Sequence, residues 1–136
     1  MKKTKPYLQQ ATFEQVLSYN PADPATFTPS PVVNAVADAL HETHLIESGE
    51  IADYLNVDRI KLSHALSLDL GMTLIEVIHL YRLHQVKQYV AQHPDEKLEE
   101  VAHACGYASA GSLWRFMQRK VGTTVRGEKS MARPEN

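Results

Sequence analysis

Two stretches of this 136-residue chain, about fifty residues apart, repeat one pattern of apolar, small and turn-forming side chains. The pattern is an apolar residue followed by alanine, a turn residue with its apolar neighbour, two apolar residues one helical turn apart, and a closing glycine. The first copy carries it as Ile51-Ala52, Asn56-Val57, Leu62, Leu66 and Gly71, and the second as Val101-Ala102, Gly106-Tyr107, Leu113, Met117 and Gly122. Each copy predicts a short helix, a tight turn and a longer helix that ends at glycine. The repeat therefore favours an all-α fold with two similar subdomains.

The small residue and the turn residue of each copy predict a helix-turn-helix. Ala52 and Ala102 stand where two helices must cross closely. Asn56 and Gly106 tolerate the positive φ that such a turn needs. The paired apolar residues of each second helix are expected to face the core. Because no segment alternates between apolar and polar residues, we expect no sheet.

Start and stop signals predict further helices around and between the two copies. Ser30-Pro31 pairs a hydroxyl cap with proline at the first helical position. Thr73-x-x-Glu76 is a capping box that opens a long helix, and His93-Pro94 stops it. The expected helices are approximately 12–19, 31–44, 50–55, 59–70, 74–92, 98–104 and 112–121.

These signals divide the chain into an arm, a body and a tail. Residues 1–29 contain four prolines and are expected to form a partly ordered N-terminal arm. The body is expected to span residues 30–125, and residues 126–136 a flexible basic tail. Within the body we expect a first unit at 48–71, a linker helix at 74–92 and a second unit at 97–122.

The charge of the chain is unevenly distributed. Residues 36–111 carry five basic and twelve acidic side chains, a balance of −7, within a total of −2. Residues 112–136 carry six basic and two acidic side chains, a balance of +4. A basic end on an acidic body indicates a surface that faces a polyanion. The alternative interpretation is an ordinary solvated helix and tail.

Composition excludes several classes of protein. The apolar fraction of 43% is typical of a globular chain, and no apolar stretch is long enough to span a membrane. Polar residues, among them Gln9, Gln10 and Glu14, follow the basic start where a signal peptide needs an apolar core, so we expect a cytoplasmic protein. The lone cysteine, Cys105, excludes a disulfide framework and a cysteine-rich zinc site.

Enzyme chemistry is poorly supported. His41 and His44 have the spacing of two metal ligands on one helix face, but no third ligand accompanies them. Cys105 lies close to His103, yet the repeat aligns it with Leu55, which predicts a buried thiol rather than a nucleophile. No phosphate loop or glycine-rich nucleotide motif is present. The sequence therefore predicts no enzyme, no cofactor and no metal site.

Two helix-turn-helix units joined by one long helix resemble the AraC/XylS-type DNA-binding domain of bacterial transcription regulators, over about residues 33–124. The matching residues are Ile51-Ala52, Leu62, Leu66, Gly71 and Arg82-Leu83 in the first half, and Val101-Ala102, Gly106-Tyr107, Leu113-x-Arg115, Met117 and Gly122 in the second. The sequence departs from the family at Val125, where a proline is usual, and in its acidity. The resemblance implies a homeodomain-like pair of units that binds adjacent major grooves as a sequence-specific transcription regulator.

The resemblance places the DNA contacts on the exposed faces of the two second helices. Arg115 is the main candidate, for guanine or for phosphate, against the alternative of a surface arginine paired with an acid. Trp114 is expected to be exposed, either stacking on DNA or covering the core edge. The predicted contact residues are Arg59, Ile60, Lys61, Ser63, His64, Ser109, Ser112, Trp114, Arg115, Arg119 and Lys120.

Two further expectations concern phosphate. The helix starts at Asp58–Arg59 and Ala108–Ser109 are expected to hold phosphate through backbone N–H groups. If the protein reads DNA, its cations should also gather on one side. The cations concerned are Arg59, Lys61, Arg82, Arg115, Arg119 and Lys120.

Double-stranded DNA is the expected partner, with RNA polymerase a candidate and no membrane. We expect a monomer, or a weak homodimer formed through the N-terminal arm. The chain is either a stand-alone regulator or the DNA-binding part of a longer one. The alternative function is a helix-turn-helix adaptor that binds proteins and has little affinity for DNA.

Overall fold

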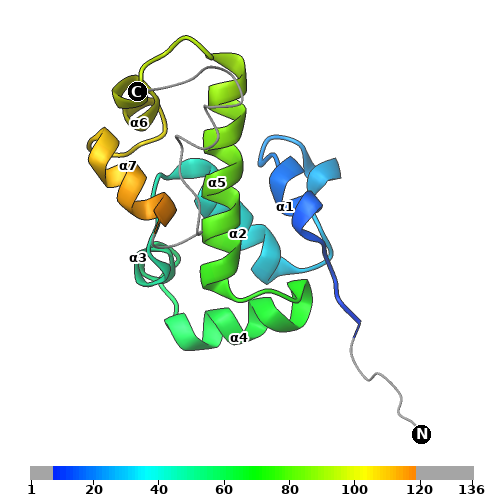
Figure 1. Cartoon of the computed structure of the whole chain (residues 1–136). Helices are drawn as coiled ribbons and strands as arrows, with labels where there is room; N and C mark the ends of the chain where they lie inside the picture. The colour runs from blue at the N-terminus through cyan, green and yellow to red at the C-terminus, as the bar shows by residue number, and fades with distance from the viewer. Residues whose placement is uncertain (1–7, 119–136) are drawn as a thin grey trace, which may run out of the picture. The chain divides into compact units, whose positions relative to one another are not determined.

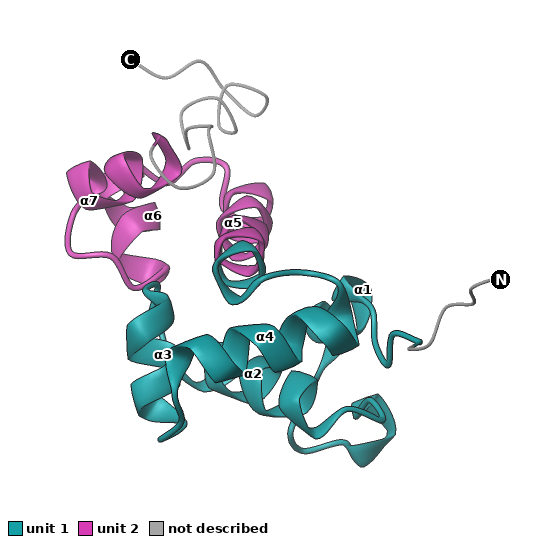
Figure 2. Ribbon diagram, turned by 90° about the horizontal axis from the view of Figure 1, so that it is seen from below, with its two compact units in different colours: residues 1–78 teal, residues 79–136 magenta. Residues whose placement is uncertain are grey.

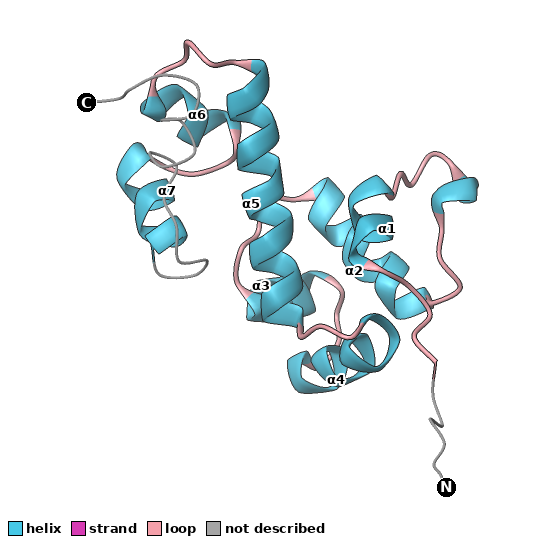
Figure 3. Ribbon diagram, turned by 45° about the vertical axis from the view of Figure 1, so that its right-hand side comes forward, coloured by secondary structure: helices cyan, strands magenta, loops and turns pink. Residues whose placement is uncertain are grey.

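The computed structural model describes residues 8–118, and every regular element in that range is a helix (Figures 1 and 3). The elements are α1 (Phe13–Ser18), the 3₁₀ helix η1 (Pro24–Thr26), α2 (Pro31–Glu42), α3 (Ser48–Tyr54), α4 (Arg59–Leu70), α5 (Leu74–Gln92), α6 (Leu98–Ala104) and α7 (Ala110–Phe116). The predicted all-α fold is therefore confirmed. The closing residues of the second repeat and the basic tail lie outside the described residues. None of the described helices is both long and apolar enough to cross a membrane.

The chain forms two compact units, which we call unit 1 (residues 1–78) and unit 2 (residues 79–136) (Figure 2). The boundary falls inside α5, so the long helix begins in unit 1 and continues in unit 2. Unit 1 contains α1 to α4. Unit 2 contains α6 and α7. Each unit therefore holds one copy of the sequence repeat.

The core of unit 1 is built around α2, which contacts α1, α3 and α4. Val33, Val36 and Leu40 follow the helical period and are fully buried, as the sequence pattern predicts. Ile51 on α3 and Leu66 on α4 are also fully buried in this unit. Burying each such side chain stabilises the fold by about 1.5–3 kcal/mol before the loss of chain entropy is counted.

Side-chain caps fix the ends of the helices in unit 1. The Ser30 hydroxyl accepts the Val33 N–H at 3.1 Å and donates to the Asp69 carboxylate at the end of α4. Gly71 ends α4 with a φ of +80° and donates its N–H to the Ser67 carbonyl. The start of α2 is thereby tied to the end of α4.

Within unit 1, the described part of the N-terminal arm is hydrogen-bonded to the end of α4. The N–H groups of Gln10 and Ala11 both donate to the Asp69 carbonyl, at 2.8 and 3.1 Å. The Gln9 amide donates to the Leu70 carbonyl at 2.9 Å. These bonds satisfy carbonyls that the end of α4 leaves without helical partners. Further along the arm, Val16 of α1 is buried.

The long helix α5 begins with the predicted capping box and ends at Gln92, before the predicted stop. The Thr73 N–H donates to the Glu76 carboxylate at 3.0 Å, and the Glu76 N–H donates to the Thr73 hydroxyl at 3.2 Å. Leu74 donates its N–H to the Ser63 hydroxyl of α4 at 3.2 Å. This contact fixes the connection between α4 and α5.

The core of unit 2 lies where α6 packs against α7. Val101, Leu113 and Met117 are fully buried. Phe116 packs edge-on against His79, with ring centroids 5.5 Å apart, and contacts Tyr107 at 5.6 Å. Phe116 therefore connects the second helix-turn-helix to the part of α5 that belongs to unit 2.

Three predicted helix boundaries differ from the structure. α2 ends at Glu42, so His44 is an exposed residue outside the helix and the proposed two-histidine helix face does not exist. α3 starts at Ser48 rather than near Glu50. α7 starts at Ala110 rather than Ser112, because the Ser109 hydroxyl caps it by accepting the Ser112 N–H at 3.1 Å.

Candidate nucleic-acid interface

The two helix-turn-helix motifs, α3–α4 in unit 1 and α6–α7 in unit 2, use the same backbone devices. Asn56 has a φ of +59° and Gly106 a φ of +91°, as the sequence predicts for the turn residue. The residue after each turn residue donates its N–H back to the small alanine of the first helix. Val57 bonds the Ala52 carbonyl at 3.0 Å, and Tyr107 bonds the Ala102 carbonyl at 2.8 Å. The two turns therefore share a positive φ at the turn residue and a hydrogen bond back to the alanine.

The second helix of each motif buries the predicted face. On α4, Leu62 and Leu66 have exposed fractions of 6% and 0%. In the second motif, Leu113 on α7 and Met117 at its C-terminal cap both have 0%. The opposite faces of α4 and α7 are left on the surface of their units. These surfaces hold the predicted DNA-contact residues.

On α4, most of the predicted residues are exposed. Arg59, Lys61 and His64 lie on the surface, and Ile60 is 68% exposed. Ser63 is half-buried, and its hydroxyl accepts the backbone N–H that opens α5. We therefore assign Ser63 to the α4–α5 connection.

On α7, the arginine and the tryptophan are exposed, whereas the two serines serve the helix start. Trp114 is 42% exposed, and Arg115 also lies on the surface. Ser109 and Ser112 are half-buried, and the Ser109 hydroxyl donates to the Ser112 hydroxyl at 3.3 Å. Arg119 and Lys120, also predicted as contacts, lie outside the described residues.

The Arg115 side chain bends back over the first turn of α7. A Cβ atom at Gly111 would lie 3.3 Å from one Arg115 guanidinium nitrogen and 3.6 Å from the Ser109 hydroxyl. Helical side chains lean toward the helix start, so this direction is the expected one. Because Gly111 has no side chain, it leaves room for the guanidinium.

Both helix starts that were expected to hold phosphate already have a carboxylate beside them. The Asp58 carboxylate accepts the Lys61 N–H at 3.0 Å and so caps α4. The Glu99 carboxylate of α6 accepts the Ala110 N–H at 3.1 Å at the start of α7. A carboxylate at a helix start neutralises the favourable end of the dipole and repels phosphate. Phosphate contacts at these two starts therefore lose their physical basis.

Comparison with known proteins assigns the motifs to a family. A family described as "Helix-turn-helix domain" matches residues 51–127, which is more than half of the chain and covers most of α3 and all of α4, α6 and α7. This chain belongs to the AraC/XylS-type helix-turn-helix family. The family match points to a DNA-binding transcription regulator and away from an enzyme.

One relative of this AraC/XylS-type chain is the "Xylose operon regulatory protein" of Haemophilus influenzae. The two are 28% identical over 106 residues. The match covers 77% of this chain but only 27% of the relative, so the chain spans about a quarter of the relative's length. No solved structure matches the chain.

Arg82, which matches the AraC/XylS-type pattern, does not join the surface cations. It is only 1% exposed, its guanidinium donates to the Gln85 side chain at 2.8 Å, and it lies 5.5 Å from the Tyr81 ring. Burial lowers its pKa. Arg82 therefore does not count among the surface cations that could gather on one side, and its role lies in the core of unit 2.

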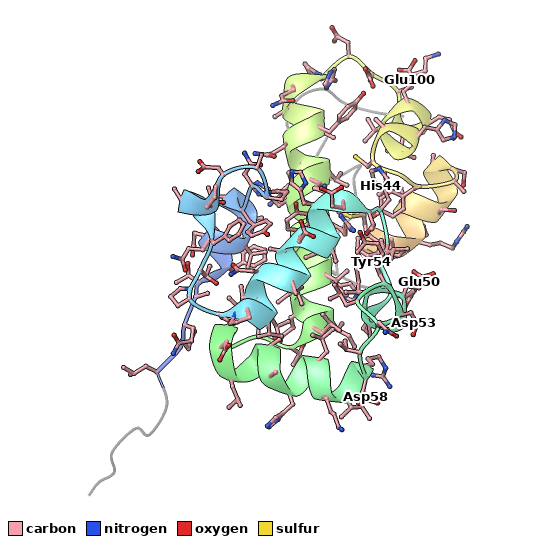
Figure 4. The ribbon with its side chains drawn as sticks, turned by 180° about the vertical axis from the view of Figure 1, so that it is seen from behind. His44, Glu50, Asp53, Tyr54, Asp58 and Glu100 are labelled. Carbon is pink, nitrogen blue, oxygen red and sulfur yellow. The ribbon has the colours of Figure 1, made fainter. Side chains whose placement is uncertain are left out.

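The motif in unit 1 carries an acidic and apolar surface that sequence reasoning did not single out. Glu50, Asp53 and Tyr54 are exposed on α3, and Asp58 lies at the start of α4 (Figure 4). Tyr54 is 51% exposed, and Val57 in the turn is 46% exposed. The helical spacing of these acids was readable in the sequence, but which face of α3 the core covers was not.

The remaining reactive side chains offer no catalytic arrangement within residues 8–118. No three His, Cys, Asp or Glu side chains in this range gather closely enough to hold a metal ion. His41 pairs with the adjacent Glu42 at 3.5 Å. Cys105 is half-buried, and burial raises its pKa to about 11. Its thiol is therefore protonated at neutral pH and a weak nucleophile.

Proposed function

We propose that this chain is a sequence-specific transcription regulator that binds double-stranded DNA with α4 and α7 in adjacent major grooves. The exposed face of α7 supports this proposal most directly. Arg115 and Trp114 lie there together, on a helix whose other face is fully buried and whose sequence falls within the family match. A rigid helix with an exposed arginine is a common means of reading the major groove.

The two motifs have different parts in this proposal. On α7, the Arg115 guanidinium bonds guanine O6 and N7 or a phosphate, and Trp114 packs against the sugar or a thymine methyl. On α4, Arg59 and Lys61 contact phosphates, while Ile60 packs on a thymine methyl. Arg119 and Lys120 are proposed phosphate contacts by resemblance alone. Side chains, rather than helix starts, supply the phosphate contacts.

We further propose that the protein acts as a monomer in the cytoplasm, with RNA polymerase as a candidate partner. The arm supports a monomer, because its apolar residues are used inside unit 1. Ala11, Val16 and Tyr19 are all buried there. A dimer formed through these residues would have to unpack them first.

A salt-dependent DNA titration tests the proposal. The full chain is titrated with a random duplex of about 20 base pairs at several salt concentrations, and the fluorescence of its only tryptophan, Trp114, reports binding. We expect affinity to fall steeply with salt, each phosphate contact contributing about −0.9 to the log–log slope. Absence of binding at about 50 mM salt by the folded protein would refute the proposal.

A variant with three cations removed, and a matched control, show which surface binds. Replacing Arg59, Lys61 and Arg115 by alanine should flatten the slope by about 0.9 for each of these side chains that pairs with a phosphate. Lys87→Ala removes an exposed cation of α5 outside the proposed interface and should leave the slope unchanged. Equal effects of the two changes would mean that binding is not localised to α4 and α7.

A second function, a protein-binding adaptor, is favoured by the acidic and apolar surface of α3. Glu50 and Asp53 repel DNA, and an exposed aromatic residue such as Tyr54 is typical of protein contacts. The titration separates the two functions. Weak or absent DNA binding, with intact helix content by circular dichroism, would favour the adaptor.

A further inference from the structure

Two side chains of α6 hold the turn of the second motif. The Glu99 carboxylate accepts the Ala110 N–H through one oxygen at 3.1 Å, and its other oxygen lies 3.4 Å from His103 Nε2. The same His103 nitrogen lies 3.1 Å from the Ala108 carbonyl. A neutral His103 with its proton on Nε2, or a charged one, donates to this carbonyl. Glu99 and His103 thus contact the backbone of the turn on both sides of Ser109.

These two contacts are made in the longer of the two turns. In the first motif the helix cap, Asp58, follows the turn residue Asn56 by two positions. In the second motif the cap, Ser109, follows Gly106 by three positions. The additional residue is Ala108, whose carbonyl His103 contacts. A longer turn has more freedom, and the Glu99–His103 pair restrains the added residue.

The first motif has no counterpart of this pair. The repeat aligns Glu99 with Gly49 and His103 with Asp53. Gly49 has no side chain, and Asp53 is an exposed acid that cannot donate to a carbonyl when ionised. The first motif relies on the Asp58 cap alone at the start of α4.

We propose that Glu99 and His103 are positioning residues for DNA binding, which set the direction of α7 and hence the place of the Arg115 guanidinium. This inference rests on the proposed function. The Arg115 side chain folds over Gly111, next to Ser109, so its guanidinium lies beside the turn that Glu99 and His103 contact. A tilt of α7 at its start would move the guanidinium away from its target. A misplacement of this kind weakens binding although no contact residue has changed.

The negative charge of Glu99 makes the proposal easy to test. A carboxylate beside a DNA-binding helix repels phosphate, so by charge alone any neutral replacement should strengthen binding. The positioning role predicts that the replacement must still accept a hydrogen bond from Ala110. Glu99→Gln keeps an acceptor oxygen, whereas Glu99→Ala removes the charge and the acceptor together.

The experiment measures duplex affinity of the full chain for these two variants. We expect Glu99→Gln to bind as tightly as the original chain or slightly tighter. We expect Glu99→Ala to bind about three- to tenfold more weakly, the usual effect of removing one hydrogen bond. Asp95→Ala is the matched control, because it removes an exposed acid of the same unit and should not weaken binding. Equal changes in affinity for both Glu99 variants would overturn the proposal.

A second pair tests the histidine in the same way. Glutamine at position 103 can donate an amide N–H to the Ala108 carbonyl, and alanine cannot. We expect His103→Ala to weaken DNA binding and His103→Gln to restore most of it. Equal binding by both variants and the original chain would remove His103 from the proposal.

Hydrogen exchange of the Ala110 amide separates this inference from the proposed function, because it needs no DNA. The amide should exchange slowly in the original chain and in Glu99→Gln, and faster in Glu99→Ala. Fast exchange in the original chain would refute the Glu99–Ala110 hydrogen bond even if the protein binds DNA. Failure of the original chain to bind any duplex would refute the proposed function, and the positioning role with it.

Discussion

The two helix-turn-helix motifs share their internal construction and differ in what they present outside. Both bury two apolar residues of the second helix, and both bond the residue after the turn back to an alanine carbonyl. The start of α4, however, carries Asp58 and the exposed Ile60, while the exposed face of α7 carries Arg115 and Trp114. The fold and the exposed surface are therefore encoded by different positions of the repeat. This separation lets one scaffold carry two different surfaces.

The largest expected effect tests whether the two cores are equivalent. Leu66→Ala in unit 1 and Leu113→Ala in unit 2 each remove a fully buried side chain and leave a cavity. We expect each change to lower the free energy of unfolding of its own unit by about 2–5 kcal/mol. Hydrogen exchange of the amides in each unit measures the two effects separately.

The control for the core comparison is Leu68→Ala, which removes the same side chain from an exposed position of α4. It should change stability by less than about 0.5 kcal/mol. A destabilisation below about 1 kcal/mol for either buried leucine would show that one motif is held together differently from the other.

The next effect concerns DNA specificity. It tests whether the exposed faces of α4 and α7 have different functions. We expect Arg115→Ala to lower the affinity for a selected target site by about 1–3 kcal/mol and to reduce discrimination at one base position. Lys61→Ala should weaken binding to all sequences alike, because a phosphate contact carries no sequence information. Fluorescence anisotropy of labelled target and random duplexes distinguishes the two. A uniform decrease for Arg115→Ala would reassign it to phosphate.

The turns offer a smaller contrast, which depends on backbone conformation. Ala at position 106 would have to adopt a positive φ, so Gly106→Ala should destabilise unit 2 by about 1–2 kcal/mol. Asn56→Gly should be within about 0.5 kcal/mol of neutral, because glycine adopts the same conformation freely. Denaturant unfolding measures both. A tolerated alanine at position 106 would mean that the longer second turn adjusts its conformation.

The smallest expected effect lies at the start of α4. Asp58→Asn keeps a side-chain cap but removes the charge that repels phosphate. We expect stability to change by a few tenths of a kcal/mol and the affinity for random duplex to rise by about 0.3–1 kcal/mol. The gain should fade at high salt. No gain at low salt would place the start of α4 away from the DNA backbone.

Most of the fold was predictable because the signals are local. Caps, glycine stops and the period of apolar residues indicated the positions of α4, α5 and α6, since each depends on neighbours within a few residues. The error at the end of α2 is local too, because the backbone of Thr43 leaves the helical conformation, with φ −130° and ψ 173°. His44 continued the apolar spacing but not the helix.

The candidate site was less predictable, because the roles of its residues depend on distant partners. Arg82 has the sequence context of a surface cation, and only the packing of unit 2 shows that it is buried. Ser63 looks like a contact residue until its bond to Leu74 is seen. Glu99 reaches Ala110 across eleven positions, a spacing that no helical pattern predicts. In contrast, the exposure of Trp114 followed directly from the burial of its neighbours in the helix.

The bonds at Asp69 affect how the chain can be divided in the laboratory. The family match begins at residue 51, yet the carbonyl of Asp69 receives two N–H groups from residues 10 and 11, and its carboxylate receives the Ser30 hydroxyl. A fragment cut at the family boundary would lack all three donors and would also lack α2, the centre of the unit 1 core. The smallest piece of unit 1 expected to fold by itself therefore starts before Gln9, well upstream of the segment that identifies the family.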